Sequence, residues 1–278
     1  MMKSEQSVAQ HYTHGSLEQA ILAALAASGK DLEHLTPADL APVDEFHIGG
    51  REATVDFAAQ LEIKPGLEML DIGSGLGGAS RYFAHECGCR VTGIDLTQEF
   101  VSTAERLAKR VRLENCVSYR QASALALPFT AARFDVAYML HVGMNIEDKA
   151  GLFAEVRRTL KPGGIFGIYD VMCDSGEGDL RFPVPWATHS DMSFVETPAT
   201  YWRLLEGAGF VVLAERSRRA FAVEFFDKMR ARAAQDAATP PLGLHILMGA
   251  SAPQKVANMI ENLERGLIVP VEIIARAV

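Results

Sequence analysis

Cysteine is scarce in this sequence of 278 residues, and no apolar run reaches the roughly 18 residues that suggest a membrane span. The polar segment before residue 11 also lacks the apolar core of a signal peptide. The cysteines include no CxxC pair, so free thiols are expected rather than a disulfide framework or a zinc site. These four are Cys87, Cys89, Cys116 and Cys173. The pattern is typical of a cytoplasmic protein.

Basic residues are also in the minority. The chain has 27 Lys and Arg against 35 Asp and Glu, a net charge of −8. Such a charge disfavours non-specific binding to nucleic acids and to anionic lipids, so neither a nucleic acid nor a membrane is expected as a partner. The densest basic stretch is Arg216, Arg218 and Arg219. We expect it to form a solvated surface.

Short apolar segments alternate with helical patterns from residue 64 onward. The segments LEMLDIG, RVTGIDL, VSYRQA, DVAYMLH and IFGIYDV read as buried strands, with helices such as 97–112 and 147–160 between them. This alternation predicts right-handed βαβ units and a parallel sheet. Strand 210–215 and a last strand VPVEIIARA follow, with helices near 222–236 and 252–265 between them, so these two strands can pair antiparallel. The fold class is therefore α/β, with a doubly wound, mostly parallel seven-stranded sheet and an antiparallel last strand.

Helical patterns also precede the first strand. Residues 16–28 and about 50–61 read as helices, and Thr36-Pro37 as a helix start. We expect an N-terminal helical cap or lid over residues 1–62. A second domain would cover residues 63–278, with insertions near 171–199 and 218–266 on the substrate side.

The sharpest local signal is a glycine-rich turn after the first strand. Gly73, Gly75 and Gly78 satisfy the GxGxxG pattern, which lets the backbone approach a ligand closely. Asp95 ends the next strand, where a carboxylate can accept both hydroxyls of a ribose. The turn could cradle the pyrophosphate of a dinucleotide or the methionine part of S-adenosylmethionine. Asp71, two residues before the first glycine, favours a ligand with an ammonium and a sulfonium.

Longer segments carry a resemblance to a known family. LDIGSGLGGASRYFA, VTGIDLTQEFV and ALALPFTAARFDVAYMLHVGMNIEDKAGLFAEVRRTLKPGGIFGIYDV resemble class I S-adenosylmethionine-dependent methyltransferases, over roughly residues 45–278. DEFHIGGREAT, FPVPWATHSDMSFVETPATYWRLLEGAGF and PPLGLHILMG are most similar to small-molecule enzymes of the sarcosine/dimethylglycine N-methyltransferase group. The resemblance implies a Rossmann-like methyltransferase fold and S-adenosyl-L-methionine as cofactor.

The resemblance also implies which residues hold that cofactor. Ser123 departs from the family pattern, because many members have an acid there, beside the adenine amine. Tyr12 could fold over the cofactor as a lid, or simply pack within the cap. The implied cofactor-binding residues follow the first four strands in turn: Asp71, Gly73, Ser74, Gly75 and Gly77, then Asp95 and Leu96, then Ala122, Ser123 and Ala124, then Leu140 and His141.

Methyl transfer is an in-line displacement from an already activated sulfonium, so the protein chiefly positions the nucleophile. A neutral amine needs little acid–base help, whereas a hydroxyl or a carbon acid needs a base. His141, after the fourth strand, and His47, in the segment before the sheet, are the candidate catalytic residues. Each could instead pack or form a local hydrogen bond. No metal-ligand cluster is expected.

Four further residues are candidates for contacting the acceptor. Trp186 and His189 lie in the insertion, where ligand crevices of α/β sheets form, although Trp186 could equally anchor the loop. Asn145 is expected first as a helix N-cap and only second as a substrate contact. Met144 suits an adaptable pocket or a core.

The implied partner is a small-molecule acceptor, foremost an amine such as sarcosine or dimethylglycine. Carbon, oxygen and sulfur acceptors remain open. Two other functions also remain open: an NAD-dependent dehydrogenase, and a protein that binds S-adenosylmethionine without catalysing its reaction. The C-terminal helices and the last strand could support a homodimer.

Overall fold

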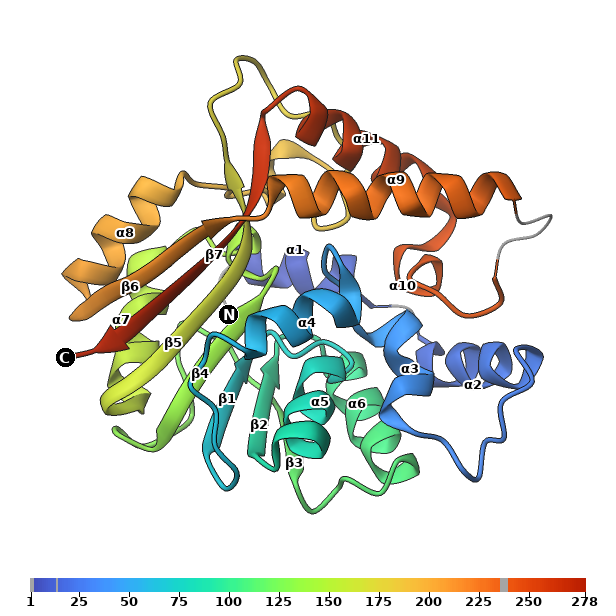
Figure 1. Ribbon diagram of the computed structural model, residues 1–278, viewed down its shortest axis with the longest axis horizontal. Coiled ribbons are helices and arrows are strands. Elements are labelled where there is room, and N and C mark those ends of the chain that lie inside the picture. The colour runs from blue at the N-terminus through green and yellow to red at the C-terminus, as the bar shows by residue number, and fades with distance from the viewer. Residues whose placement is uncertain (1–2, 14, 236–239) are drawn as a thin grey trace.

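The structure, a computed structural model, describes residues 3–13, 15–235 and 240–278. Seven strands form one sheet in the order β3-β2-β1-β4-β5-β7-β6 (Figure 1). Strands β1 to β5 pair in parallel, and β7 is antiparallel to both β5 and β6. This arrangement confirms the predicted fold class. The strands are β1 (Glu68–Ile72), β2 (Arg90–Asp95), β3 (Val117–Gln121), β4 (Phe134–Leu140), β5 (Leu160–Cys173), β6 (Phe210–Ser217) and β7 (Ile268–Ala277).

The strand order reverses direction at β1. Its two neighbours are β2 on one side and β4 on the other, so the chain leaves the middle of the sheet in both directions. In open α/β sheets, such a switch point opens a crevice outside the carboxyl ends of the strands. Any ligand site is therefore expected where β1, β2, β3 and β4 end.

Helices cover both faces of the sheet, because side chains alternate along each buried strand. Met69 of β1 and Tyr138 of β4 pack with α4, α5 and α6. Leu70 and Met139 point to the other face and pack with α7 and α8. The helices named here are α4 (Gly50–Ala58), α5 (Gly78–Cys87), α6 (Gln98–Arg110), α7 (Lys149–Thr159) and α8 (Pro198–Gly207).

The N-terminal helices share the first of these cores with the sheet. They are α1 (Lys3–His11), α2 (Leu17–Ala27) and α3 (Pro37–Asp44), followed by α4. A fully buried ion pair, Arg81 Nη2 to Asp44 Oδ2 at 2.5 Å, joins α5 to the end of α3. A Cβ on Gly78 would lie only 2.4 Å from the carbonyl oxygen of Asp44, so a glycine is required for this contact. The cap thus packs directly onto the helix that follows the glycine turn. The predicted domain boundary between residues 62 and 63 stays a prediction.

The C-terminal excursion between β6 and β7 contains one helix more than the sequence predicted. Helices α9 (Arg219–Gln235) and α11 (Ala252–Glu264) run side by side in Figure 1, as expected. The short helix α10 (His245–Met248) was not predicted. It contacts α2, so the excursion reaches back to the cap.

The prediction that Arg216, Arg218 and Arg219 form a solvated surface is wrong for Arg218, whereas Arg216 is exposed and Arg219 half-buried. The Arg218 side chain is only 7% exposed, and its Nη2 lies 2.8 Å from Asp56 Oδ2. Glu272 of β7 is fully buried and pairs with Arg216 at 2.6 Å and with Arg218 at 3.5 Å. Arg216 and Glu272 face each other across the β6–β7 ladder, so strand pairing places the guanidinium groups beside a carboxylate that cannot stay buried alone.

Replacing Arg218 by alanine is expected to lower the free energy of unfolding by about 3 kcal/mol, because the buried carboxylate of Glu272 loses one of its two cationic partners and keeps Arg216 and Gln60. Urea unfolding followed by circular dichroism measures the loss. Arg276→Ala is the control, because that arginine pairs with Glu62 on the surface, where such a pair contributes less than about 1 kcal/mol. Equal losses in both variants would contradict the assignment.

Candidate functional site

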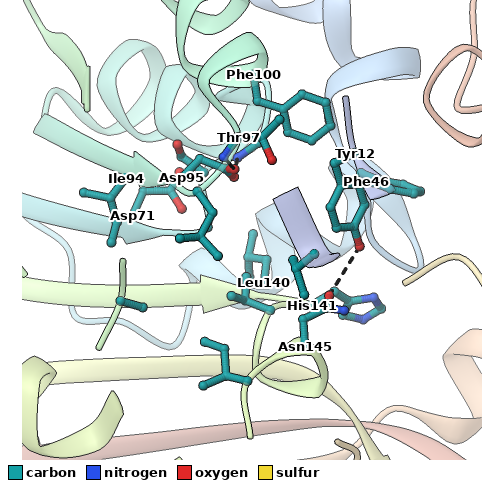
Figure 2. A pocket seen from close by; sticks show the side chains of 18 of the residues that line it. Tyr12, Phe46, Asp71, Ile94, Asp95, Thr97, Phe100, Leu140, His141 and Asn145 are labelled. Carbon is teal, nitrogen blue, oxygen red and sulfur yellow. Dashed lines mark hydrogen bonds between the residues drawn. The ribbon is translucent and has the colours of Figure 1, made fainter. Parts of the chain in front are cut away.

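A large pocket lies where the first four strands end. Its empty volume is about 1200 Å³, including the mouth that opens to solvent. The sheet forms its floor, and α1, the segment after α3 and α10 contribute to its walls. Figure 2 shows Asp71 and Asp95 on one side of it, with Tyr12 and Phe46 across from them. The topology therefore brings residues from all four strand ends into one space.

The glycine turn forms one wall, and its backbone requires glycine. Gly73, Gly75 and Gly77 have φ angles of +68°, +53° and +79°, a region that other residues rarely adopt. A Cβ on Gly73 would lie 2.5 Å from Val142 Cγ2, whereas a Cβ on Gly75 would meet nothing within 4 Å. Gly75 thus presents bare backbone to the pocket.

Asp95 ties the turn to the end of β2. Its Oδ2 accepts a hydrogen bond from the Gly75 N–H at 2.9 Å, and its Oδ1 accepts one from the Thr97 N–H at 2.8 Å. Burial raises the pKa of the Asp95 carboxyl, while the hydrogen bonds from these N–H groups oppose that shift. The carboxylate lines the pocket, in the position expected for binding a ribose.

Asp71 is a second buried carboxylate beside the turn. Its Oδ2 accepts a hydrogen bond from Ser80 Oγ at 2.6 Å. Burial raises its pKa to about 7, and the nearby negative charge of Asp95 adds to this shift. Two carboxylates at adjacent strand ends create a negative potential, and a cationic ligand would relieve their repulsion.

The end of β3 forms an apolar slot. Ala122, Ala124 and Leu125 line it, and Leu96 and Phe100 line the same pocket. Ser123 lies among them. Its Oγ accepts a hydrogen bond from the Leu125 N–H at 3.0 Å and donates one to the Glu5 carboxylate of α1.

His141 follows β4 in a left-handed backbone conformation, with φ of +56°, which is unusual for a residue other than glycine. The residue is half-buried, and its Nε2 is itself buried and has no hydrogen-bond partner within the described ranges. Burial, together with the neighbouring His47, lowers its pKa well below the usual value. The ring is therefore neutral near pH 7, and its unused Nε2 is buried although the residue lines the pocket.

His47 enters from the cap and lies beside His141, with ring centroids 6.0 Å apart. Its Nε2 is 3.0 Å from the carbonyl oxygen of Gly50 and 3.1 Å from Thr54 Oγ1, so this nitrogen is already engaged. Burial lowers its pKa to about 4. Both candidate catalytic histidines line the pocket; the engaged ring nitrogen of His47 is Nε2, whereas Nε2 of His141 has no partner among the described residues.

Tyr12 lies over the pocket just after α1. Its hydroxyl donates a hydrogen bond to Asn145 Oδ1 at 3.3 Å, drawn as a dashed line in Figure 2. Its ring packs near Phe46 and Phe100, at centroid distances of 6.3 and 5.7 Å. Burial and the negative charge of Asp95 raise its pKa far above the usual value. This placement fits the predicted lid.

The prediction that Asn145 caps a helix is wrong. Asp148 is the N-cap of α7 and accepts a hydrogen bond from the Gly151 N–H at 2.8 Å. Asn145 ends a short 3-10 helix, η1 (Gly143–Asn145), and its Nδ2 donates to the carbonyl oxygen of Trp186 at 2.8 Å. It therefore bridges the lid residue Tyr12 and the insertion after β5.

The other predicted substrate residues do not reach the pocket. Trp186 is buried, and its Nε1–H donates to Ser193 Oγ at 2.9 Å, so it anchors the insertion. Met144 packs with Trp186 in the same apolar cluster. His189 is exposed at the start of the 3-10 helix Ser190–Met192. None of the three lines the pocket.

Sequence reasoning missed several residues that the fold adds to the pocket. Leu247 comes from the unpredicted α10, and Glu5 and Val8 come from a polar segment with no apolar periodicity strong enough to predict a helix. For Glu5 and Val8, the sequence offered one signal: residues three apart lie on the same face of a helix. The residues not predicted include Glu5, Val8, Asp44, Glu45, Phe46, Thr97, Phe100, Leu125, Val142, Ile146, Glu147 and Leu247.

Over the described residues, no group of three or more His, Cys, Asp or Glu side chains is arranged to hold a metal ion. Within the same ranges, no helix is long and apolar enough to cross a membrane. All four cysteines are free thiols, as expected.

Comparisons with known proteins agree with this architecture. Residues 70–168 match the family model described as a methyltransferase domain. A sterol 24-C-methyltransferase of Gibberella zeae is 34% identical over 123 residues, covering 44% of this chain and 32% of the relative. Phosphoethanolamine N-methyltransferase 1 of Zea mays is 33% identical over 169 residues, covering 60% of this chain and 33% of the relative. The match thus spans about a third of the length of these curated relatives.

Among solved structures, a putative sarcosine dimethylglycine methyltransferase from Galdieria sulphuraria superposes with a TM-score of 0.65 at 19% identity. The superposition covers 81% of this chain and 84% of that chain. At this identity, the likeness shows a shared fold.

Proposed function

We propose that this chain, whose residues 70–168 match a methyltransferase domain, binds S-adenosylmethionine in the pocket and transfers its methyl group to a small-molecule acceptor. One observation carries the proposal. The buried Asp71 and the half-buried Asp95 flank a bare glycine turn, and no described residue that lines the pocket is a lysine or an arginine. A sulfonium, an ammonium and two ribose hydroxyls suit this site, whereas a pyrophosphate would meet repulsion. The dehydrogenase alternative is therefore disfavoured.

The residues present fit S-adenosylmethionine. Ser74 Oγ is buried without a hydrogen-bond partner in the described chain, and the Cβ direction of Gly75 points into open space. We assign Asp71 to the cofactor's ammonium and Asp95 to its ribose hydroxyls. Leu76 and Ala79 line the pocket at the start of α5, where backbone N–H groups lack helical partners and can meet the cofactor's carboxylate.

The bound cofactor supplies a methyl group that is already activated by its positive sulfur. The protein's part is then to bring the acceptor in line and to exclude water. His141 is neutral and has an unpartnered, buried Nε2, so a rotation of the ring toward the pocket would let this atom accept a hydrogen bond from the acceptor's N–H or O–H group. His47 packs beside it, and its contact with the carbonyl oxygen of Gly50 through Nε2 fixes the orientation of its ring.

The pocket also favours one class of acceptor. Phosphate or carboxylate groups are bound by cations or clustered N–H donors, yet the described lining has no lysine or arginine, and burial keeps His47 and His141 neutral. The lining instead carries the acidic side chains Glu5, Asp71, Asp95 and Glu147, together with Asp44 and Glu45, whose charges are compensated by ion pairs with Arg81 and Arg51. We therefore favour an amine without an acid group over sarcosine and dimethylglycine, which carry a carboxylate. A neutral apolar acceptor methylated at carbon, as the name of the sterol relative suggests for that protein, is the second candidate.

Asp95→Ala is expected to weaken binding of S-adenosylhomocysteine by about 1–3 kcal/mol, because two buried ribose hydroxyls lose their partner. Isothermal titration calorimetry measures the affinity. Asp135→Ala serves as the control, because Asp135 lies near the amino end of β4 and pairs with Lys161. Unchanged affinity in the Asp95 variant would refute the ribose assignment.

Affinity for S-adenosylmethionine is expected to rise with pH between 5.5 and 7.5. Asp71 is protonated in the free protein below its pKa of about 7. The ammonium favours the ionised carboxylate, so binding below that pH must release a proton. The affinity should fall up to about tenfold per unit of pH below 7. Asp71→Asn should bind more weakly and without this slope; a slope retained in that variant would assign it to another group.

The acceptor itself is found by incubating the protein with labelled S-adenosylmethionine and a metabolite extract, then identifying the labelled product by mass spectrometry. We expect a product without phosphate or carboxylate groups. Ethanolamine and phosphoethanolamine, which differ by one phosphate group, serve as a matched pair of competitors for the labelling reaction. A phosphorylated or carboxylated product would refute the acceptor class, and absence of any product despite cofactor binding would favour a non-catalytic role.

A further inference from the structure

The N-terminal helix brings a carboxylate to the pocket from far away in the chain. Glu5 of α1 lines the pocket, and its Oε1 accepts a hydrogen bond from Ser123 Oγ, 118 positions further along the sequence. Ser123 Oγ also accepts a hydrogen bond from the Leu125 N–H at 3.0 Å. The single proton of this hydroxyl is therefore donated to Glu5, and the serine has no further proton to give to a ligand.

The order of the strands indicates which part of the ligand lies there. The glycine turn follows β1, Asp95 ends β2, and residues 122–125 follow β3, the next strand outward in the sheet. If the ribose binds Asp95, the base extends toward the end of β3. The slot there is apolar on its sides, with Leu96, Phe100 and Leu125 among its lining residues, as a flat base requires.

We propose that Glu5 accepts a hydrogen bond from the exocyclic amine of the cofactor's adenine. This inference rests on the proposed function, because it assumes an adenosyl ligand. A carboxylate accepts hydrogen bonds but cannot donate them, so it selects an amine over a carbonyl at this position of the base. The acid thus comes from the cap and compensates for the serine at position 123.

The rest of α1 and the residues just after it are seated over the same pocket. Val8 is buried at the pocket wall, and Tyr12 donates to Asn145 Oδ1 at 3.3 Å. His11 Nε2 lies 3.2 Å from the carbonyl oxygen of Pro185, in the insertion. Base recognition by Glu5 adds to these contacts, so a bound adenosyl group and a seated α1 stabilise each other.

The test compares S-adenosylhomocysteine with S-inosylhomocysteine, which has a carbonyl in place of the amine. Isothermal titration calorimetry of the full chain is expected to show a preference for the adenosyl compound on the order of 10- to 100-fold, the range for a hydrogen bond to a charged group. Glu5→Ala should reduce this preference to less than about threefold. Gln6→Ala, at an exposed position of the same helix, should retain it and so controls for disturbance of α1.

A rescue variant separates recognition from a structural role. Adding Ser123→Asp to Glu5→Ala places a carboxylate at the end of β3 and should restore the preference for the adenosyl compound. If the native protein and Glu5→Ala discriminate equally between the two compounds, the inference is overturned while the proposed function stands. If the native protein binds neither compound, the proposed function itself fails.

Discussion

The site depends on a short link between two neighbouring parallel strands. The carboxylate of Asp95, at the end of β2, accepts the backbone N–H of Gly75 in the turn after β1. This bond is possible because parallel strands end at the same edge of the sheet, and because glycines let the turn fold back with positive φ angles. The pocket wall is thereby held in place before any ligand arrives. Preorganised polar groups bind more tightly because their ordering cost is already met in folding.

Burial then determines the charge that this wall presents. Asp71 and Asp95 lie in a poorly hydrated space, which raises the pKa of both carboxyl groups. The same desolvation lowers the pKa values of His47 and His141, so that neither imidazole contributes a positive charge near neutral pH. A pocket lined by carboxylates and neutral imidazole rings selects its ligand by charge as well as by shape. Many activities share this fold, so it is the charge of the lining that distinguishes an adenosyl sulfonium from a dinucleotide.

The cap completes the pocket through contacts between distant parts of the chain. Asp44 pairs with the buried Arg81 of α5, which places the segment containing Phe46 and His47 over the strand ends. Asn145 holds Tyr12 on one side and the backbone of the insertion on the other. The insertion is itself kept in place by the buried Trp186. Lid, cap and insertion therefore meet at η1, directly after β4.

The sequence by itself determined the order of the strands along the chain, most of the helices between them, the glycine turn and the two carboxylates beside it. These features depend on side-chain periodicity and on backbone conformations within a few residues, which local patterns record. Only the tertiary structure decided that Arg218 is buried, that Asn145 bridges instead of capping, and that Trp186 anchors the insertion. It alone decided that Glu5 meets Ser123. Such contacts join residues that are far apart in the chain. A local sequence pattern does not indicate which distant residues will meet in the folded protein.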